Sequence, residues 1–203
     1  MSIFQYFEYK KSISQQPRII YDIGAWKGHW STQAKSILPN SQFYMFEANT
    51  CHRNDLQKTG LPFFDGTVLS SPEKKSVTYY TGGSRTGDSY YKEMTDAYSD
   101  KECIKVQCKT LDQMIYEHDL PFPDFIKIDT QGSELDILSG ASFLDKVNEI
   151  YCECPFLRYN TGAPNLQEYL DFFTDKNFIP INILETHYLG DALLQIDVLF
   201  KRK

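Results

Sequence analysis

The chain has 203 residues, 41% hydrophobic and 24% charged, which is the composition of a folded globular protein and excludes general disorder. Asp and Glu (27) outnumber Lys and Arg (21), and the formal net charge of -6 disfavours a nucleic-acid partner. The sequence has no apolar run long enough for a membrane span, no secretory signal and no C-x-x-C pair, so we expect a cytoplasmic protein with reduced thiols.

In the first third of the chain, short apolar runs alternate with segments of helical periodicity. The expected strands cover 18–23, 41–47 and 62–69. The expected helices cover 29–38 and 49–60, after a short helical segment within 1–17. Pro39 ends the first of these helices and Gly60 ends the second. A loop that contains Gly24 and Gly28 joins the first strand to its helix.

The middle of the chain, over residues 70–109, has a different character. Strand patterns are present at 77–80 and 104–107. Between them, residues 81–89 form a polar segment with three glycines. Loops on a rigid scaffold often carry function, so we interpret 81–89 as an active-site loop.

The alternation of strands and helices resumes after residue 109. The expected strands cover 124–128, 149–154, 178–184 and 193–200. The expected helices cover 111–117, 133–139 and a segment that starts after Asn165. Strands separated by helices predict a mostly parallel sheet with helices on both faces, and the last two strands predict an antiparallel hairpin. We therefore expect one α/β domain over residues 1–203.

In such a sheet, ligands bind beyond the carboxyl ends of the strands. Four strands end in acidic residues, which are Asp22, Glu47, Asp129 and Glu153. Gly24 lets a ligand approach the backbone, and Glu47 lies 23 positions later, where an acid can accept hydrogen bonds from both hydroxyls of a ribose.

The spacing of Gly24 and Gly28 is G-x-x-x-G and not the G-x-G-x-x-G of a dinucleotide cradle. A ligand with a ribose, a cationic centre and no phosphate suits the acidic rim better, because carboxylates attract a cation in a cleft of low dielectric constant. S-adenosylmethionine is such a ligand. A nicotinamide-dependent oxidoreductase on a similar fold stays open as an alternative.

The chain resembles the FkbM-type, S-adenosylmethionine-dependent methyltransferases from about residue 18 to its end. The segments that carry the likeness are DIGAWKGHWS (22–31), FEAN (46–49), KTLDQ (109–113), DFIKIDTQGSELDILSGA (124–141), the strand of Glu153, and QIDVLF (195–200). The resemblance implies a single Rossmann-like class I methyltransferase domain.

The resemblance also implies a cofactor site, with Glu47 at the ribose and 65–69 along the adenine. The predicted cofactor-binding residues are Asp22, Gly24, Ala25, Trp26, Gly28, Glu47, Ala48, Asp65, Leu69 and Gln131. Two positions depart from the family pattern. Trp26 stands where the family usually has Asn, and Cys154 and Pro155 follow Glu153 where the family often has His.

The predicted catalytic residues are Asp129, Lys127, Glu153 and His29. Asp129 is the candidate general base, since a sugar hydroxyl is a weak acid that benefits from a base. Lys127 lies two residues earlier on the same face of its strand, either as a catalytic group or as a structural partner of Asp129. His29 lies in the first turn of the first long helix and is a second candidate for contact with the acceptor.

Asp129 and Glu153 end neighbouring strands, and two carboxylates there suit Mg²⁺ or Mn²⁺. Alternatively, these acids only hydrogen-bond loops and the cofactor amine. The predicted substrate contacts are Arg85, Asp88 and Glu134, and Glu134 is also a third candidate oxygen for the metal.

The sequence thus predicts an O-methyltransferase that acts on a hydroxyl of a sugar in a glycan or polysaccharide. Two alternatives stay open: a non-catalytic module on a degenerate methyltransferase fold, and an enzyme acting on a small-molecule natural product. A partner domain or a second copy of the chain is a further candidate partner.

Overall fold

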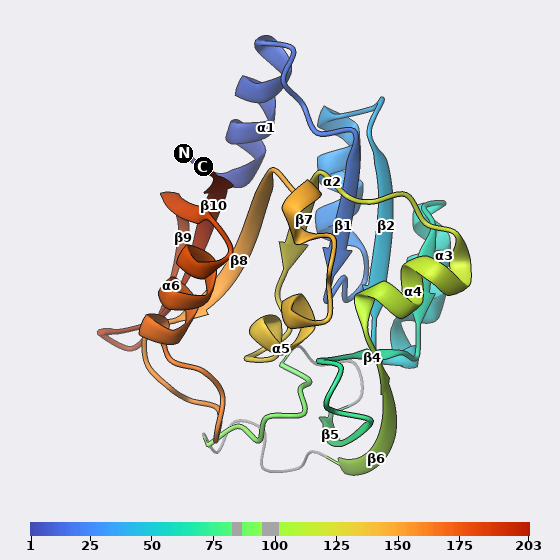
Figure 1. Cartoon of the computed structure of the whole chain (residues 1–203), viewed down its shortest axis with the longest axis vertical. Coiled ribbons are helices and arrows are strands. Elements are labelled where there is room, and N and C mark those ends of the chain that lie inside the picture. The colour runs from blue at the N-terminus through green and yellow to red at the C-terminus, as the bar shows by residue number, and fades with distance from the viewer. Residues whose placement is uncertain (83–86, 95–101) are drawn as a thin grey trace.

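The computed structural model describes residues 1–82, 87–94 and 102–203 (Figure 1). Its centre is a seven-stranded sheet with the order β3-β2-β1-β7-β8-β10-β9. The strands are β1 (Ile19–Ile23), β2 (Gln42–Glu47), β3 (Phe63–Asp65), β7 (Phe125–Ile128), β8 (Glu149–Pro155), β9 (Phe178–Leu189) and β10 (Ala192–Arg202). Neighbours from β3 to β8 are parallel, whereas β10 is antiparallel to β8 and β9. The predicted parallel sheet and closing hairpin are confirmed.

Helices cover both faces of this sheet, as predicted (Figure 1). The helices on one face are α1 (Ile3–Ser12), α2 (His29–Ile37) and α3 (Arg53–Thr59), and those on the other are α4 (Leu111–His118), α5 (Glu134–Ser139) and α6 (Leu166–Asp175). Two 3₁₀ turns, η1 (Thr50–His52) and η3 (Leu144–Lys146), precede α3 and β8.

Side chains alternate between the two faces because a strand has a period of two. Phe125 packs on Phe7 of α1 with ring centroids 5.2 Å apart. On the other face, Phe200 stacks on Phe173 of α6 at 3.7 Å. Large buried rings on both faces fix the strands in place and thereby fix the positions of their carboxyl ends.

A smaller sheet lies beyond the carboxyl ends of the main strands (Figure 1). It has the order β4-β6-β5, formed by β4 (Val68–Leu69), β5 (Ser76–Thr81) and β6 (Glu102–Lys109). The prediction of one strand over 62–69 was wrong. Gly66 has a φ of 74°, a left-handed conformation that ends β3 in the main sheet and redirects the chain into β4.

Within the described part of the chain, no helix has the length and apolar character needed to cross a membrane. The longest helices, α1 and α6, have 10 residues each. None of the five cysteines forms a disulfide, and Cys152 and Cys154 are buried in β8.

Candidate functional site

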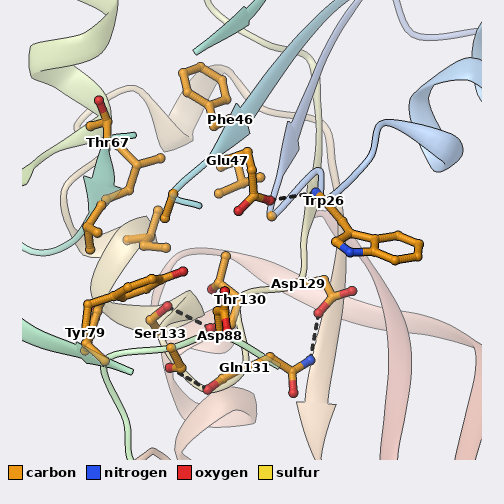
Figure 2. Close-up of a pocket in the computed structure, with 18 of the residues that line it drawn as sticks. Trp26, Phe46, Glu47, Thr67, Tyr79, Asp88, Asp129, Thr130, Gln131 and Ser133 are labelled. Carbon is orange, nitrogen blue, oxygen red and sulfur yellow. Dashed lines mark hydrogen bonds between the residues drawn. The ribbon is translucent and has the colours of Figure 1, made fainter. Parts of the chain in front are cut away.

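A cleft opens at the carboxyl ends of β1, β2 and β7, with β4 and β5 on its opposite wall (Figure 2). Its empty volume, including the open mouth, is about 750 Å³, which is the size of a small-molecule site. β1 and β7 are neighbours at the point where the strand order reverses, the usual ligand position in an open α/β sheet. The predicted residues that line it are Gly24, Trp26, Glu47, Ala48, Leu69, Asp88, Asp129 and Gln131.

Gly24 lets the loop after β1 pass directly against the end of β7. Its φ is 76°, and a Cβ at this position would lie 1.8 Å from the carbonyl oxygen of Asp129. Its N–H donates to the carbonyl of Phe46 at 3.0 Å, and its own carbonyl accepts from Nζ of Lys127 at 2.8 Å. The backbone of this loop is therefore tied to both neighbouring strands.

Glu47 is the last residue of β2 and is nearly buried in the cleft wall. Its Oε2 accepts the N–H of Trp26 at 2.7 Å and its Oε1 accepts the N–H of Asn49 at 2.8 Å (Figure 2). Burial raises the pKa of Glu47 to about 7, although these two hydrogen bonds act to lower it. Each oxygen retains a lone pair, so the carboxylate can still accept two hydroxyl donors from a ligand.

Lys127 lies beneath the cleft and joins β7 to β1. Its Nζ lies 3.2 Å from Oδ1 of Asp22 and 3.7 Å from Oδ2 of Asp129. Burial by itself lowers the pKa of Lys127, but the carboxylates of Asp22 and Asp129 raise it above its usual value. These contacts fit the structural alternative that the sequence left open, and a catalytic role of Lys127 stays a prediction.

Asp22 is fully buried and its side chain does not reach the cleft. Its Oδ2 accepts from the hydroxyl of Ser31 in α2 at 2.6 Å, and its Oδ1 pairs with Lys127. The structure therefore gives the predicted cofactor ligand Asp22 an indirect role: it holds the loop that contains Gly24.

Asp129 extends from the end of β7 into the cleft, and its side chain is 42% exposed. Nε2 of Gln131 donates to Oδ1 of Asp129 at 3.0 Å (Figure 2). The same Nε2 donates to Oε2 of Glu153 at 2.8 Å. The side-chain amide thus lies between the two carboxylates, in the position that a shared cation would need. This arrangement does not fit the prediction of a metal held by Asp129 and Glu153.

Glu153 is buried behind Gln131, and Nε2 of Gln195 also donates to it. Burial and the nearby carboxylate of Asp129 raise the pKa of Glu153 well above its usual value. Its side chain lines a small cavity beside the cleft and not the cleft itself. Glu153 therefore lies outside the cleft lining, and its catalytic role stays a prediction.

Glu134, the first residue of α5, is fully buried. Its carboxylate accepts from the N–H groups of Thr130 and Gly132, at 2.7 and 3.0 Å, and from the hydroxyl of Tyr169. These bonds hold the loop between β7 and α5, and Glu134 does not line the cleft, so its contact with substrate or metal stays a prediction.

We expect Tyr169→Phe to lower the free energy of unfolding by about 1.5–3 kcal/mol, the usual loss for a hydrogen bond to a charged group. Tyr169 is fully buried, and its hydroxyl donates to Glu134. Urea unfolding measures the change. Tyr116→Phe, at a side chain that is 89% exposed, is the matched control and should change nothing. Equal stability of the two variants would show that the bond to Glu134 does not hold the loop.

The remaining predicted residues lie around the cleft. Asp65 forms an ion pair with Arg53 at 2.7 Å and does not line the cleft. His29 is exposed, outside the cleft lining and against the Trp26 ring, and its contact with the acceptor stays a prediction. Ala25 and Gly28 belong to the loop after β1, are buried and do not line the cleft. Arg85 lies outside the described residues.

Asp88 is part of the cleft wall and is tied to two neighbouring elements. Its Oδ2 accepts from Nδ2 of Asn49 at 2.7 Å and its Oδ1 accepts from the N–H of Gly82 at 2.9 Å. The hydroxyl of Ser89 donates to the carbonyl of Gln131 at 2.9 Å. The described end of the glycine-rich segment, residues 87–89, thus lines the cleft, and the role of 81–89 as an active-site loop stays a prediction.

Sequence reasoning missed several lining residues from elements distant in the chain. His52 of η1 and Tyr79 of β5 both line the cleft and are nearly buried. Their positions follow from the pairing of β5 with β6 and from the turn after β2, which no local pattern predicts. The only feature of the sequence that pointed to such lining residues was the high content of aromatic side chains.

The chemistry of the lining limits the ligand. Three carboxylates, of Glu47, Asp88 and Asp129, line the cleft, and none of its described lining residues is Lys or Arg. Such a lining disfavours a polyphosphate and attracts a cation. Apolar side chains complete the walls and can enclose a planar ring; these are Ile23, Phe46, Val68, Leu69 and Ile137.

Comparisons with known proteins identify the family of the chain. A family model described as "Methyltransferase FkbM domain" matches residues 22–180. Among curated proteins, no sequence matches.

Three solved structures illustrate the likeness in fold. A precorrin-6y C5,15-methyltransferase from Geobacter metallireducens GS-15 is 14% identical, with a TM-score of 0.53 over 99% of this chain and 88% of that chain. A putative O-methyltransferase from Klebsiella pneumoniae is 13% identical, with a TM-score of 0.54 over 99% and 80%. The magnesium protoporphyrin IX methyltransferase from Synechocystis PCC 6803, solved with bound SAM, is 8% identical, with a TM-score of 0.57 over 98% and 77%.

Proposed function

This chain belongs to the FkbM methyltransferase family, and from that premise we propose that it methylates a hydroxyl of a sugar in a glycan or polysaccharide. S-adenosylmethionine is its cofactor and supplies an electrophilic methyl group on a sulfonium. One observation carries the proposal: the carboxylate of Asp129 is exposed in a cleft that has no described cationic side chain in its lining.

The lining fits this cofactor. The two oxygens of Glu47 each have a free lone pair for a ribose hydroxyl. The apolar wall of Val68 and Leu69 suits a planar base, and the carboxylates favour the sulfonium. By contrast, no described Lys or Arg is present for the pyrophosphate of a nicotinamide cofactor. We therefore place the ribose at Glu47 and the reacting methyl group near Asp129.

The proposed acceptor class rests on the same lining. A carboxylate is a suitable base for a hydroxyl, and Asp129 is held in place by Gln131. Trp26 and Tyr79 offer aromatic surface against which a sugar ring can pack. A nucleic-acid acceptor is disfavoured because phosphates need cationic side chains, which the described lining does not provide.

The test is methyl transfer from labelled S-adenosylmethionine to three sets of acceptors: defined oligosaccharides, aromatic and polyketide alcohols, and RNA. We expect label on oligosaccharides, at an oxygen. Transfer to the small alcohols alone would show that the acceptor is a small-molecule alcohol and not a glycan. Cofactor binding without transfer to any acceptor would favour the non-catalytic module.

We expect S-adenosylhomocysteine to bind wild-type protein about tenfold more tightly at pH 8 than at pH 6. Burial gives Glu47 a pKa of about 7, so the carboxylate that accepts the ribose hydroxyls forms only as the pH rises through 7. Glu47→Gln should bind more weakly and lose most of this pH dependence. Calorimetry at both pH values measures the effect.

Glu8→Gln, on the exposed side of α1, is the matched control and should behave as wild type. An unchanged affinity and pH dependence in Glu47→Gln would contradict the placement of the ribose at Glu47.

A further inference from the structure

Three side chains of metal-ligand type gather on the hairpin of β9 and β10, away from the cleft lining. They are Glu185, His187 and Asp197, and one ligand atom from each lies within 4.8 Å of the others. Glu185 and His187 share a face of β9 because they are two residues apart. Asp197 of β10 is paired directly with Glu185 across the two strands. The pairing of 185–187 with 195–197, between two register shifts of the hairpin, therefore creates the group.

This group has an excess of negative charge. Carboxylates directly opposite each other in an antiparallel pair repel, and Glu185 and Asp197 are such a pair. In residues 1–82, 87–94 and 102–203, neither of them forms an ion pair with Lys or Arg. Their one basic neighbour is His187, whose Nε2 lies 3.4 Å from Oδ2 of Asp197.

Asp197 also has an unused acceptor. Its Oδ2 accepts from the hydroxyl of Tyr151 at 2.8 Å, but its Oδ1 is buried and has no hydrogen-bond partner in the described structure. A buried carboxylate oxygen without a partner is costly.

We propose that Glu185, His187 and Asp197 bind one divalent transition-metal ion of the Zn²⁺ or Mn²⁺ type. An imidazole with two carboxylates suits these ions, whereas Mg²⁺ and Ca²⁺ prefer ligand sets made of oxygen alone. Two atoms that share a tetrahedral zinc ion lie about 3.4 Å apart, given bonds of about 2.0–2.1 Å, and this is the spacing between His187 and Asp197.

The surroundings support the site. The hydroxyl of Tyr151 donates to Asp197 and fixes its orientation, as hydrogen-bond partners of metal ligands usually do. Glu185 is exposed and can rotate toward the ion, and the side chain of His187 is 42% exposed. Three protein ligands leave an open position for water or for an oxygen of a larger molecule. None of the three residues lines the cleft, although Asp197 of β10 is paired with Glu153 of β8, one of the carboxylates joined by Gln131. The proposal rests on the contacts of the hairpin and not on the proposed methyl transfer.

The test is calorimetric titration of the full chain with Zn²⁺, repeated with Mg²⁺, and Mn²⁺ binding by electron paramagnetic resonance. We expect one Zn²⁺ per chain, one competing Mn²⁺, and far weaker Mg²⁺. His187→Ala and Asp197→Asn should each weaken Zn²⁺ binding by at least about tenfold. His118→Ala, at an exposed histidine of α4, is the matched control and should bind as wild type.

Thermal unfolding without metal establishes that each variant is folded. Zn²⁺ should then raise the unfolding temperature of wild type and His118→Ala but not of His187→Ala. No Zn²⁺ binding by wild type, or equal binding by His187→Ala and His118→Ala, would overturn the proposal.

Discussion

Asp129→Asn is expected to slow methyl transfer by about 10²–10⁴-fold, the usual contribution of a positioned general base. The amide keeps the size of the carboxylate and can still bond to Gln131, whose Nε2 lies 3.0 Å from Oδ1 of Asp129. It cannot take the proton from an acceptor hydroxyl. Alignment of the acceptor, which supplies up to about 7–11 kcal/mol in favourable cases, is left in place. Single-turnover rates with a saturating acceptor measure the change.

S-adenosylhomocysteine binding separates this effect from damage to the site. We expect Asp129→Asn to bind it nearly as well as wild type, because the ribose contact at Glu47 is untouched. Asp145→Asn, at an exposed position of η3, is the matched control and should keep full activity. A wild-type rate in Asp129→Asn would show that Asp129 is not the base.

Gly24→Ala is expected to lower the free energy of unfolding by about 2–5 kcal/mol and to abolish cofactor binding. A left-handed conformation costs an L-residue about 1–2 kcal/mol, and overpacking adds about 1–3 kcal/mol. The new Cβ would lie 1.8 Å from the carbonyl oxygen of Asp129, so the loop after β1 must move away from β7. This movement displaces the two elements that form the cleft.

Gly60→Ala provides a control that isolates the clash. Gly60 has a φ of 70°, close to that of Gly24, but a Cβ added to Gly60 would meet no atom within 4 Å. We expect a loss of only about 1–2 kcal/mol and unchanged cofactor binding. Urea unfolding and calorimetry on both variants measure the difference. If the two variants lose equal stability and bind equally well, the contact between Gly24 and Asp129 is not essential.

The sequence was sufficient to predict the main sheet and the strand ends that meet at the cleft. Alternating apolar runs and helical patterns gave the strands that carry Asp22, Glu47 and Asp129, because periodicity is a local property. Parallel strands bring their carboxyl ends to one edge, so these acids had to gather there. The sequence also predicted a glycine-dependent close approach at Gly24. The structure shows that a Cβ at this position would lie 1.8 Å from the carbonyl oxygen of Asp129.

The sequence was insufficient to predict which charged groups face the ligand. Lys127 lies in β7, Glu134 begins α5 and Glu153 lies in β8, all near the sheet edge that carries Asp129, yet all three are buried. Their burial depends on partners far along the chain, such as Tyr169 for Glu134 and Gln195 for Glu153. No local pattern encodes these contacts.

By itself, then, the sequence determined the order of strands and helices, the acidic edge of the sheet and the family of the chain. Tertiary structure alone decided that Gln131 separates Asp129 from Glu153, and that Glu185, His187 and Asp197 meet on the hairpin. The physical reason is the distance along the chain over which each effect acts. Periodicity and turns act over a few residues, whereas the protonation and access of a carboxylate depend on the groups that packing brings against it.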